Sequence, residues 1–267
     1  MQQSSIEKPS AEILHNGPLE FGGGHSTRIH AVRYPREAVI PRIVVFDHPT
    51  RLYEWCQDNE IDDAINGGFT LNHRSEDLPT VLLGNYRING RHLAAIPFPT
   101  PRSGVHINEQ RDLSIIHRDY THTLADGDFF QAGPMLVREG EVLVSDIYDF
   151  EGVALPPLQM DDDWTKDRYP RSAIGVNEHS IVTVSCNGYS PPEEVDGDRG
   201  MTLAELALFM AGLGVKDALN LDGGSKSTHI AGGKVLNNPR GGLGDNYQYF
   251  DEGLPLLSAI VFEKQSD

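Results

Sequence analysis

Two short segments of this 267-residue chain place a polar side chain at the end of an apolar stretch and follow it with paired glycines. Asn66 precedes Gly67-Gly68, and the segment Asn220-Leu221-Asp222 precedes Gly223-Gly224. Glycine lets the backbone bend and approach a ligand closely, and successive N–H groups in such a turn can bind an anion. The spacing therefore predicts two turns that line a ligand site.

The second turn carries the denser chemistry. Within seven residues it combines the Asp222 carboxylate, the Lys226 ammonium and the hydroxyls of Ser225, Ser227 and Thr228. A nucleotide-triphosphate loop needs one glycine immediately before its lysine, where this chain has Ser225, and another six positions before the lysine, where it has Asn220. No G-x-G-x-x-G pattern marks a dinucleotide site either. We interpret the segment as a ligand site of another kind.

The elements that must position these groups are mostly strands. Apolar runs predict strands at residues 39–47, with Pro41 favouring a sheet edge or an irregular start, and at 254–262. Thr50 is expected to cap a short helix, and a capping box of Thr202 and Glu205 begins the clearest helix. Residues 97–112 are expected to form a loop, and residues 151–170 a lid or a substrate-facing insertion.

This pattern predicts an α+β fold: a single domain with a mixed β-sheet, few helices and long active-site loops. We expect residues 1–25 to form a flexible N-terminal arm and residues 26–267 to form the catalytic domain.

The charge and the composition of the chain limit the classes of partner that it is expected to bind. The chain has 39 acidic and 22 basic residues, a net charge of −17, so nucleic acid and anionic membranes are not expected partners. We expect a small-molecule partner and a cytoplasmic location, because the N-terminus lacks a signal-peptide pattern. The histidine pairs His25/His30 and His117/His122 lack zinc spacing, and residues 161–163 lack the calcium-loop pattern, so no metal or cofactor is expected.

Four segments, taken in order, resemble the phosphodiester glycosidase family over about residues 30–263. The family's segments look like NGGFF, GP-L-V, R-T-A-I-G and N-L-D-G-G-G-S-S-T followed by N-x-P. In this chain they are Asn66–Phe69, Gly133–Val137, Arg171–Gly175 and Asn220–Gly224, with Asn237-Asn238-Pro239 downstream.

The resemblance implies a hydrolase that cleaves the glycosidic bond of a sugar 1-phosphodiester, giving a free sugar and a phosphomonoester. Such a reaction needs donors around the departing phosphate and a carboxylate near the anomeric carbon. We therefore assign Asp222, Arg171, Asn66 and Lys226 to catalysis, with Arg171 as the bidentate phosphate ligand. The residues expected to bind substrate are Gly67, Gly68, Gln131, Asn220, Gly223, Gly224, Ser225, Ser227, Thr228 and Asn237.

Two departures from the family pattern keep other functions open. Ser225-Lys226 stands where the family has Gly-Ser, and Thr70 replaces the second aromatic residue of NGGFF. One alternative is a biosynthetic enzyme that reuses the scaffold on a nucleotide-sugar or a glycosylated natural product. Another is a carbohydrate- or phosphate-binding protein without catalytic activity.

Overall fold

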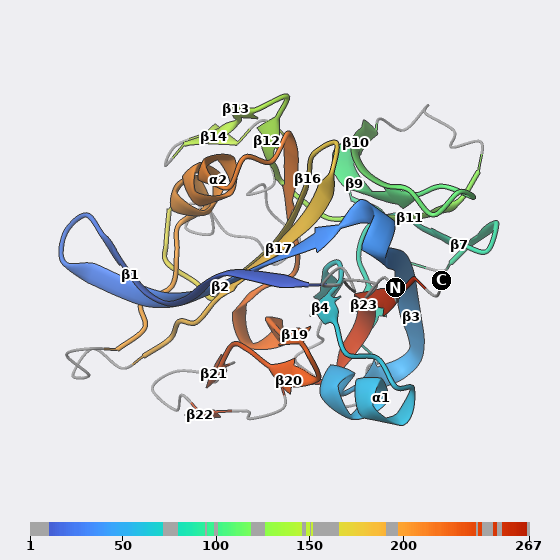
Figure 1. Ribbon diagram of the computed structural model, residues 1–267, viewed down its shortest axis with the longest axis horizontal. Coiled ribbons are helices and arrows are strands. Elements are labelled where there is room, and N and C mark those ends of the chain that lie inside the picture. Colours follow the sequence, from blue (N-terminus) through green and yellow to red (C-terminus); the bar gives the residue numbers. More distant parts are fainter. Residues whose placement is uncertain are drawn as a thin grey trace, which may run out of the picture.

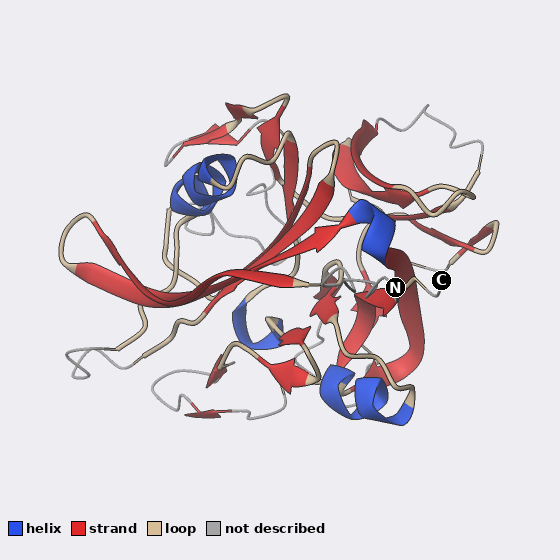
Figure 2. Cartoon of the chain, in the orientation of Figure 1, coloured by secondary structure: helices blue, strands red, loops and turns tan. Residues whose placement is uncertain are grey.

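The computed structural model describes residues 11–71, 80–93, 95–98, 101–118, 126–145, 148–149, 151, 166–190, 197–238, 240–241, 248–249 and 253–265. Strands dominate this part of the chain, with two α-helices among them (Figure 2). The fold is therefore richer in sheet than the predicted α+β class. The named strand pairs are antiparallel, so the predicted mixed sheet is corrected to antiparallel sheets, with one isolated parallel bridge between Leu83 and Ile96.

The largest sheet has seven strands, and helix α2 (Leu203–Gly212) packs against it (Figure 1). The capping box predicted for this helix is confirmed, because Thr202 accepts from the Glu205 N–H and Glu205 accepts from the Thr202 N–H. Leu206 and Met210 of the helix pack with buried residues of the sheet in one apolar cluster. The strand order is β1 (Glu12–Phe21), β2 (His25–Pro35), β17 (Ser180–Cys186), β16 (Arg171–Val176), β18 (Asp217–Asn220), β12 (Met135–Arg138) and β13 (Glu141–Val142).

Two five-stranded sheets complete the core. One has the order β20 (Lys234–Val235), β19 (His229–Ala231), β4 (Ala64–Asn66), β23 (Leu256–Lys264) and β3 (Val39–Thr50), with α1 (Leu52–Asp58) beside it. The other has the order β10 (Leu113–Arg118), β9 (Arg102–Ile107), β11 (Asp128–Gln131), β7 (Tyr86–Ile88) and β8 (Arg91–His92). One apolar cluster joins all three sheets; Ile174, Ile260 and Phe130 are members from each in turn.

The remaining described elements are short. They are the strand pairs β5 (Thr70–Leu71) with β6 (Val81–Leu82), β14 (Val144–Ser145) with β15 (Tyr148–Asp149) and β21 (Arg240–Gly241) with β22 (Gln248–Tyr249), and the 3-10 turns η1 (Arg36–Ala38) and η2 (Gly224–Lys226).

Several boundaries differ from the sequence predictions. Residues 12–21, expected within a flexible arm, form β1, whose Leu14 and Leu19 pack on the cluster under α2. The predicted loop at 97–112 contains β9, which lies inside its sheet because Gly104 leaves room for the Phe129 ring. The N-cap of α1 is Arg51, not Thr50. The edge position predicted for residues 39–47 is confirmed. Most of the predicted lid, residues 152–165, lies outside the described residues.

Candidate active site

The two glycine turns meet, and the Asn66 side chain joins them. Asn66 is fully buried at the end of β4. Its Nδ2 donates to the Asp222 carbonyl at 2.6 Å, and its Oδ1 accepts from the Thr228 N–H at 3.1 Å. Main-chain bonds reinforce the junction, since the Asp222 N–H donates to the Gly67 carbonyl at 3.1 Å. Asn66 therefore closes the loop after β18 onto the end of β4.

The first glycine pair allows a close approach between strands. A Cβ at Gly67 would lie 2.5 Å from the Ser258 Oγ, and a Cβ at Gly68 would lie 2.5 Å from the Tyr86 hydroxyl and 2.9 Å from the Gln131 carbonyl. Ser258 accepts from the Gly67 N–H at its carbonyl and from the Gly68 N–H at its Oγ. Only glycine fits at these two positions.

The second pair, Gly223-Gly224, lies against Pro170, the residue that precedes strand β16. The Gly224 N–H donates to the Pro170 carbonyl at 2.8 Å, and Gly224 has a φ of +62°, which favours glycine. The Gly223 N–H donates to Asp222 Oδ1 at 2.9 Å. Since the N–H groups of both glycine pairs have protein acceptors, the structure differs from the expected anion-binding nest.

The charged groups of the site are Asp222 and Lys226. Burial raises the pKa of Asp222 to about 6, against the opposing effects of the Lys226 ammonium and the Gly223 N–H. Burial likewise lowers the pKa of Lys226, and the Asp222 carboxylate opposes that shift. Lys226 is 8% exposed, and its Nζ donates to Thr70 Oγ1 at 2.6 Å. The loop thus carries a carboxylate and an ammonium that each stabilise the other's charge.

Hydroxyl and amide groups fix the rest of this loop. Ser227 Oγ lies 2.5 Å from Ser172 Oγ, and the Ser227 carbonyl accepts from Asn237 Nδ2 at 2.6 Å. Asn237 Oδ1 accepts from the His229 N–H at 2.8 Å. Ser225, in the 3-10 turn, is partly buried. Ser227 and Asn237 hold the loop through these bonds, and their contact with substrate stays a prediction.

Asn220 and Gln131 lie at the adjoining strand ends. Asn220 Nδ2 donates to the carbonyls of Gly133 and Leu221 at 3.0 and 2.8 Å. Its buried Oδ1 has no hydrogen-bond partner among the described residues. Gln131 Oε1 accepts from the Asn85 N–H at 2.9 Å. Both side chains therefore support the junction of the β4, β11 and β18 ends.

Arg171 borders the second glycine turn with its backbone, since a Cβ at Gly223 would lie 3.6 Å from the Arg171 Cα. Its side chain is 1% exposed and donates from Nε to the Met201 carbonyl at 3.1 Å and from NH2 to the Asp167 carbonyl at 3.1 Å. Neighbouring strand residues point to opposite faces, and the adjacent Ser172 is the one whose hydroxyl meets the loop at Ser227. The Arg171 guanidinium thus bonds main-chain carbonyls on the α2 side of the sheet, and its contact with phosphate stays a prediction.

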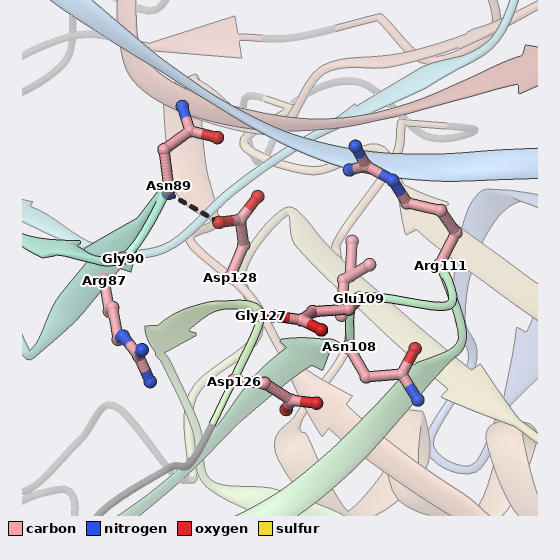
Figure 3. Close-up of a pocket in the computed structure, with 10 residues that line it drawn as sticks. Arg87, Asn89, Gly90, Asn108, Glu109, Arg111, Asp126, Gly127 and Asp128 are labelled. Carbon is pink, nitrogen blue, oxygen red and sulfur yellow. Dashed lines mark hydrogen bonds between the residues drawn. The ribbon is translucent and has the colours of Figure 1, made fainter.

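A separate acidic pocket lies at the other end of β11. It encloses about 290 Å³ and is lined by Glu109, Asp126 and Asp128 with Arg87 and Arg111 among others (Figure 3). Asp128 Oδ1 accepts from the Asn89 N–H at 2.7 Å. Asp128 opens β11 while Gln131 ends it at the junction, so Asp128 lies away from the Asp222 loop.

Among the described residues, no group of three or more histidine, cysteine, aspartate or glutamate side chains is arranged to hold a metal ion. Neither described helix is long and apolar enough to cross a membrane.

Sequence reasoning missed two contributors to the junction, Tyr86 and Ser258. Tyr86 is 1% exposed, and its hydroxyl lies 3.2 Å from Ser258 Oγ. Ser258 was visible as a lone polar residue in an apolar strand, which is a signal of a buried hydrogen bond. Nothing in the sequence around Tyr86 distinguishes it from an ordinary core tyrosine.

Comparisons with known proteins show the family and the fold of the chain. The profile of the phosphodiester glycosidase family matches residues 59–248. The catalytic domain of zebrafish N-acetylglucosamine-1-phosphodiester alpha-N-acetylglucosaminidase, solved in a form auto-inhibited by its pro-peptide, superposes with a TM-score of 0.71 at 17% identity, over 97% of this chain and 85% of that one. A Synechocystis protein superposes with a TM-score of 0.59 at 14% identity, over 96% of this chain and 64% of that one. A search of curated sequences finds no match.

Proposed function

Because the chain belongs to the phosphodiester glycosidase family, a family of glycosidase-type hydrolases, we propose that it cleaves the glycosidic bond of a sugar 1-phosphodiester. The bond between the anomeric carbon and the phosphate oxygen breaks, and its electron pair stays with the phosphate. Water adds to the anomeric carbon and gives up one proton. The products are the free sugar and a phosphomonoester.

The observation that supports this proposal is that Asp222 and Lys226 lie four residues apart on one loop, which Asn66 closes onto β4, and that each stabilises the charge of the other. The departure of a phosphate leaves positive charge at the anomeric carbon and negative charge on the phosphate oxygens. A carboxylate stabilises the first charge and an ammonium stabilises the second. Since Asp222 has a pKa of about 6, it is mainly ionised at neutral pH, and we expect activity to fall as the pH drops below 6.

Phosphorus NMR tests the reaction directly. The protein is incubated with the methyl phosphodiesters of hexose 1-phosphates and N-acetylhexosamine 1-phosphates, and the conversion of diester to monoester is followed. Asp222→Asn should lower turnover at least about a hundredfold. Asp128→Asn is the matched control, because it removes a carboxylate from the separate pocket (Figure 3) and should leave turnover unchanged.

Two outcomes would contradict the proposal. Conversion of nucleotide-sugars but not of phosphodiesters would identify a biosynthetic enzyme on the same scaffold. A melting temperature raised by phosphodiesters without any product would identify a binding protein.

A further inference from the structure

Two of the positions at which the chain departs from the family pattern, Thr70 and Lys226, are in contact. Lys226 Nζ donates to Thr70 Oγ1 at 2.6 Å, although 156 residues separate them. Both are buried, with 8% of Lys226 and 9% of Thr70 exposed. An aromatic ring at position 70 would offer no hydroxyl to the ammonium, and a serine at 226 is too short to place an ammonium there at all. The two residues therefore act as a unit.

A buried ammonium needs acceptors that fix its position. A lysine side chain has four rotatable bonds and a strongly hydrated head group, so removing it from water is costly unless its protons are accepted. Asp222 supplies the opposite charge from within the same loop. Thr70 supplies an acceptor from a different element, β5, which pairs with β6 through Thr70 and Leu82.

Hydrogen bonds to β23 hold the backbone that precedes Thr70. Thr70 follows Gly67-Gly68, whose N–H groups donate to Ser258 on β23. The backbone that precedes Thr70 is therefore bonded to β23, outside the loop that carries Lys226. The bond between Thr70 and Lys226 fixes the ammonium against the scaffold.

We propose that Thr70 is a positioning residue: its hydroxyl holds the Lys226 ammonium beside Asp222, where the ammonium binds the anionic group of the phosphodiester. This inference rests on the proposed function for the identity of the anion. The position of the ammonium is supported by its hydrogen bond to Thr70 and by the burial of both side chains.

The test compares Thr70→Val, which keeps the shape and removes the hydroxyl, with Thr70→Ser, which keeps the hydroxyl. Thr50→Val is the matched control, because the Thr50 hydroxyl bonds only its own neighbourhood, at the His48 carbonyl. Carbon NMR of protein labelled at the lysine side chains gives the pKa of Lys226, and the spectrum of Lys226→Met assigns its resonance. Dimethyl phosphate, a phosphodiester without a sugar, serves as the binding probe.

We expect Thr70→Val to lower the pKa of Lys226 by about one unit or more, because a hydrogen bond to a charged group is lost. The affinity of the variant for dimethyl phosphate should fall about tenfold at a pH above the wild-type pKa of Lys226, because there the fraction of ammonium falls tenfold. Thr70→Ser should restore both, and Thr50→Val should change neither. In active enzyme, the high-pH limb of kcat/KM should move with the pKa.

Two results would overturn the inference: a Lys226 pKa that is the same in Thr70→Val and the wild type, or Thr70→Ser as damaging as Thr70→Val. If Thr70→Val does not fold, Thr70→Ala provides the same comparison. A wild type that binds dimethyl phosphate through Lys226 but cleaves no sugar phosphodiester would refute the proposed function and support the role of Thr70.

Discussion

Replacing Asp222 with asparagine should stabilise the protein at neutral pH while removing its activity. The folded-state pKa of Asp222 is raised from 3.8 to about 6 by burial. The native state therefore holds this proton at pH values where the unfolded chain has released it, so the free energy of unfolding falls as the pH rises from 3.8 through 6. Asparagine cannot ionise, so the free energy of unfolding of the variant does not fall in this way as the pH rises.

The size of the effect follows from the shift. A difference of about two units at about 1.4 kcal/mol per unit makes Asp222→Asn more stable by roughly 3 kcal/mol above pH 7. The advantage should fall to about half that value at pH 5, because there the folded wild type is mostly protonated. Urea unfolding of both proteins at pH 7.5 and pH 5 measures the difference. Contributions from titrating groups that do not interact with Asp222 cancel between the two proteins.

The pH dependence decides whether the reasoning holds. A variant that is equally stable to the wild type at pH 7.5, or whose advantage is the same at both pH values, would show that burial does not raise this pKa. A variant less stable than the wild type would show that the carboxylate makes bonds in the loop that asparagine cannot replace.

Two further predictions concern the frame of the site. Gly68→Ala should destabilise the fold by about 1–3 kcal/mol, because its Cβ would meet the Tyr86 hydroxyl and the Gln131 carbonyl; in the same urea assay Gly17→Ala, with no atom within 4 Å of its Cβ, should have little effect. Burial lowers the pKa of His30 to about 4 and of His229 to about 3, so both are neutral when folded but bind protons when unfolded below about pH 6.5. The two histidines should therefore together lower the stability by up to about 2.7 kcal/mol per pH unit between pH 6 and 4.5, partly offset by Asp222, whose raised pKa acts in the opposite direction. His229→Gln should remove about half of the histidine contribution, so its slope should differ from that of the wild type by roughly 1.3 kcal/mol per pH unit; equal slopes would contradict this account.

The parts of the fold that sequence could predict are those fixed by local chemistry. The α2 capping box lies within four residues. The proline at position 41 lacks an N–H, which favours the edge position that β3 has in its sheet. β9 escaped detection because its segment Arg102–Ile107 carries polar residues and a glycine. The reason for the glycine, Gly104, is the ring of Phe129 on a neighbouring strand, which a Cβ there would meet. β1 was missed because its partial burial arises through pairing with β2 and packing under α2.

The site divides in the same way. The glycine turns identified Asn66, Asp222 and Lys226 as neighbours, because a Gly-Gly pair after a polar strand end is a local signal. The orientation of Arg171 could not be predicted, since it depends on which face of β16 meets α2. The contact between Lys226 and Thr70 also joins segments far apart in the sequence, and only the pairing of the strands brings them together.

The place of β23 has a consequence for how the chain acquires its fold during synthesis. β23 is the last named strand along the chain, yet it lies between β3 and β4 in its sheet. When β3 and β4 leave the ribosome, the strand that separates them in the finished sheet has not been made. Their inner edges must remain unpaired until nearly all of this sequence has emerged. Ser258, on β23, completes the setting of Gly67 and Gly68, so the glycine turn is assembled only when that last strand inserts.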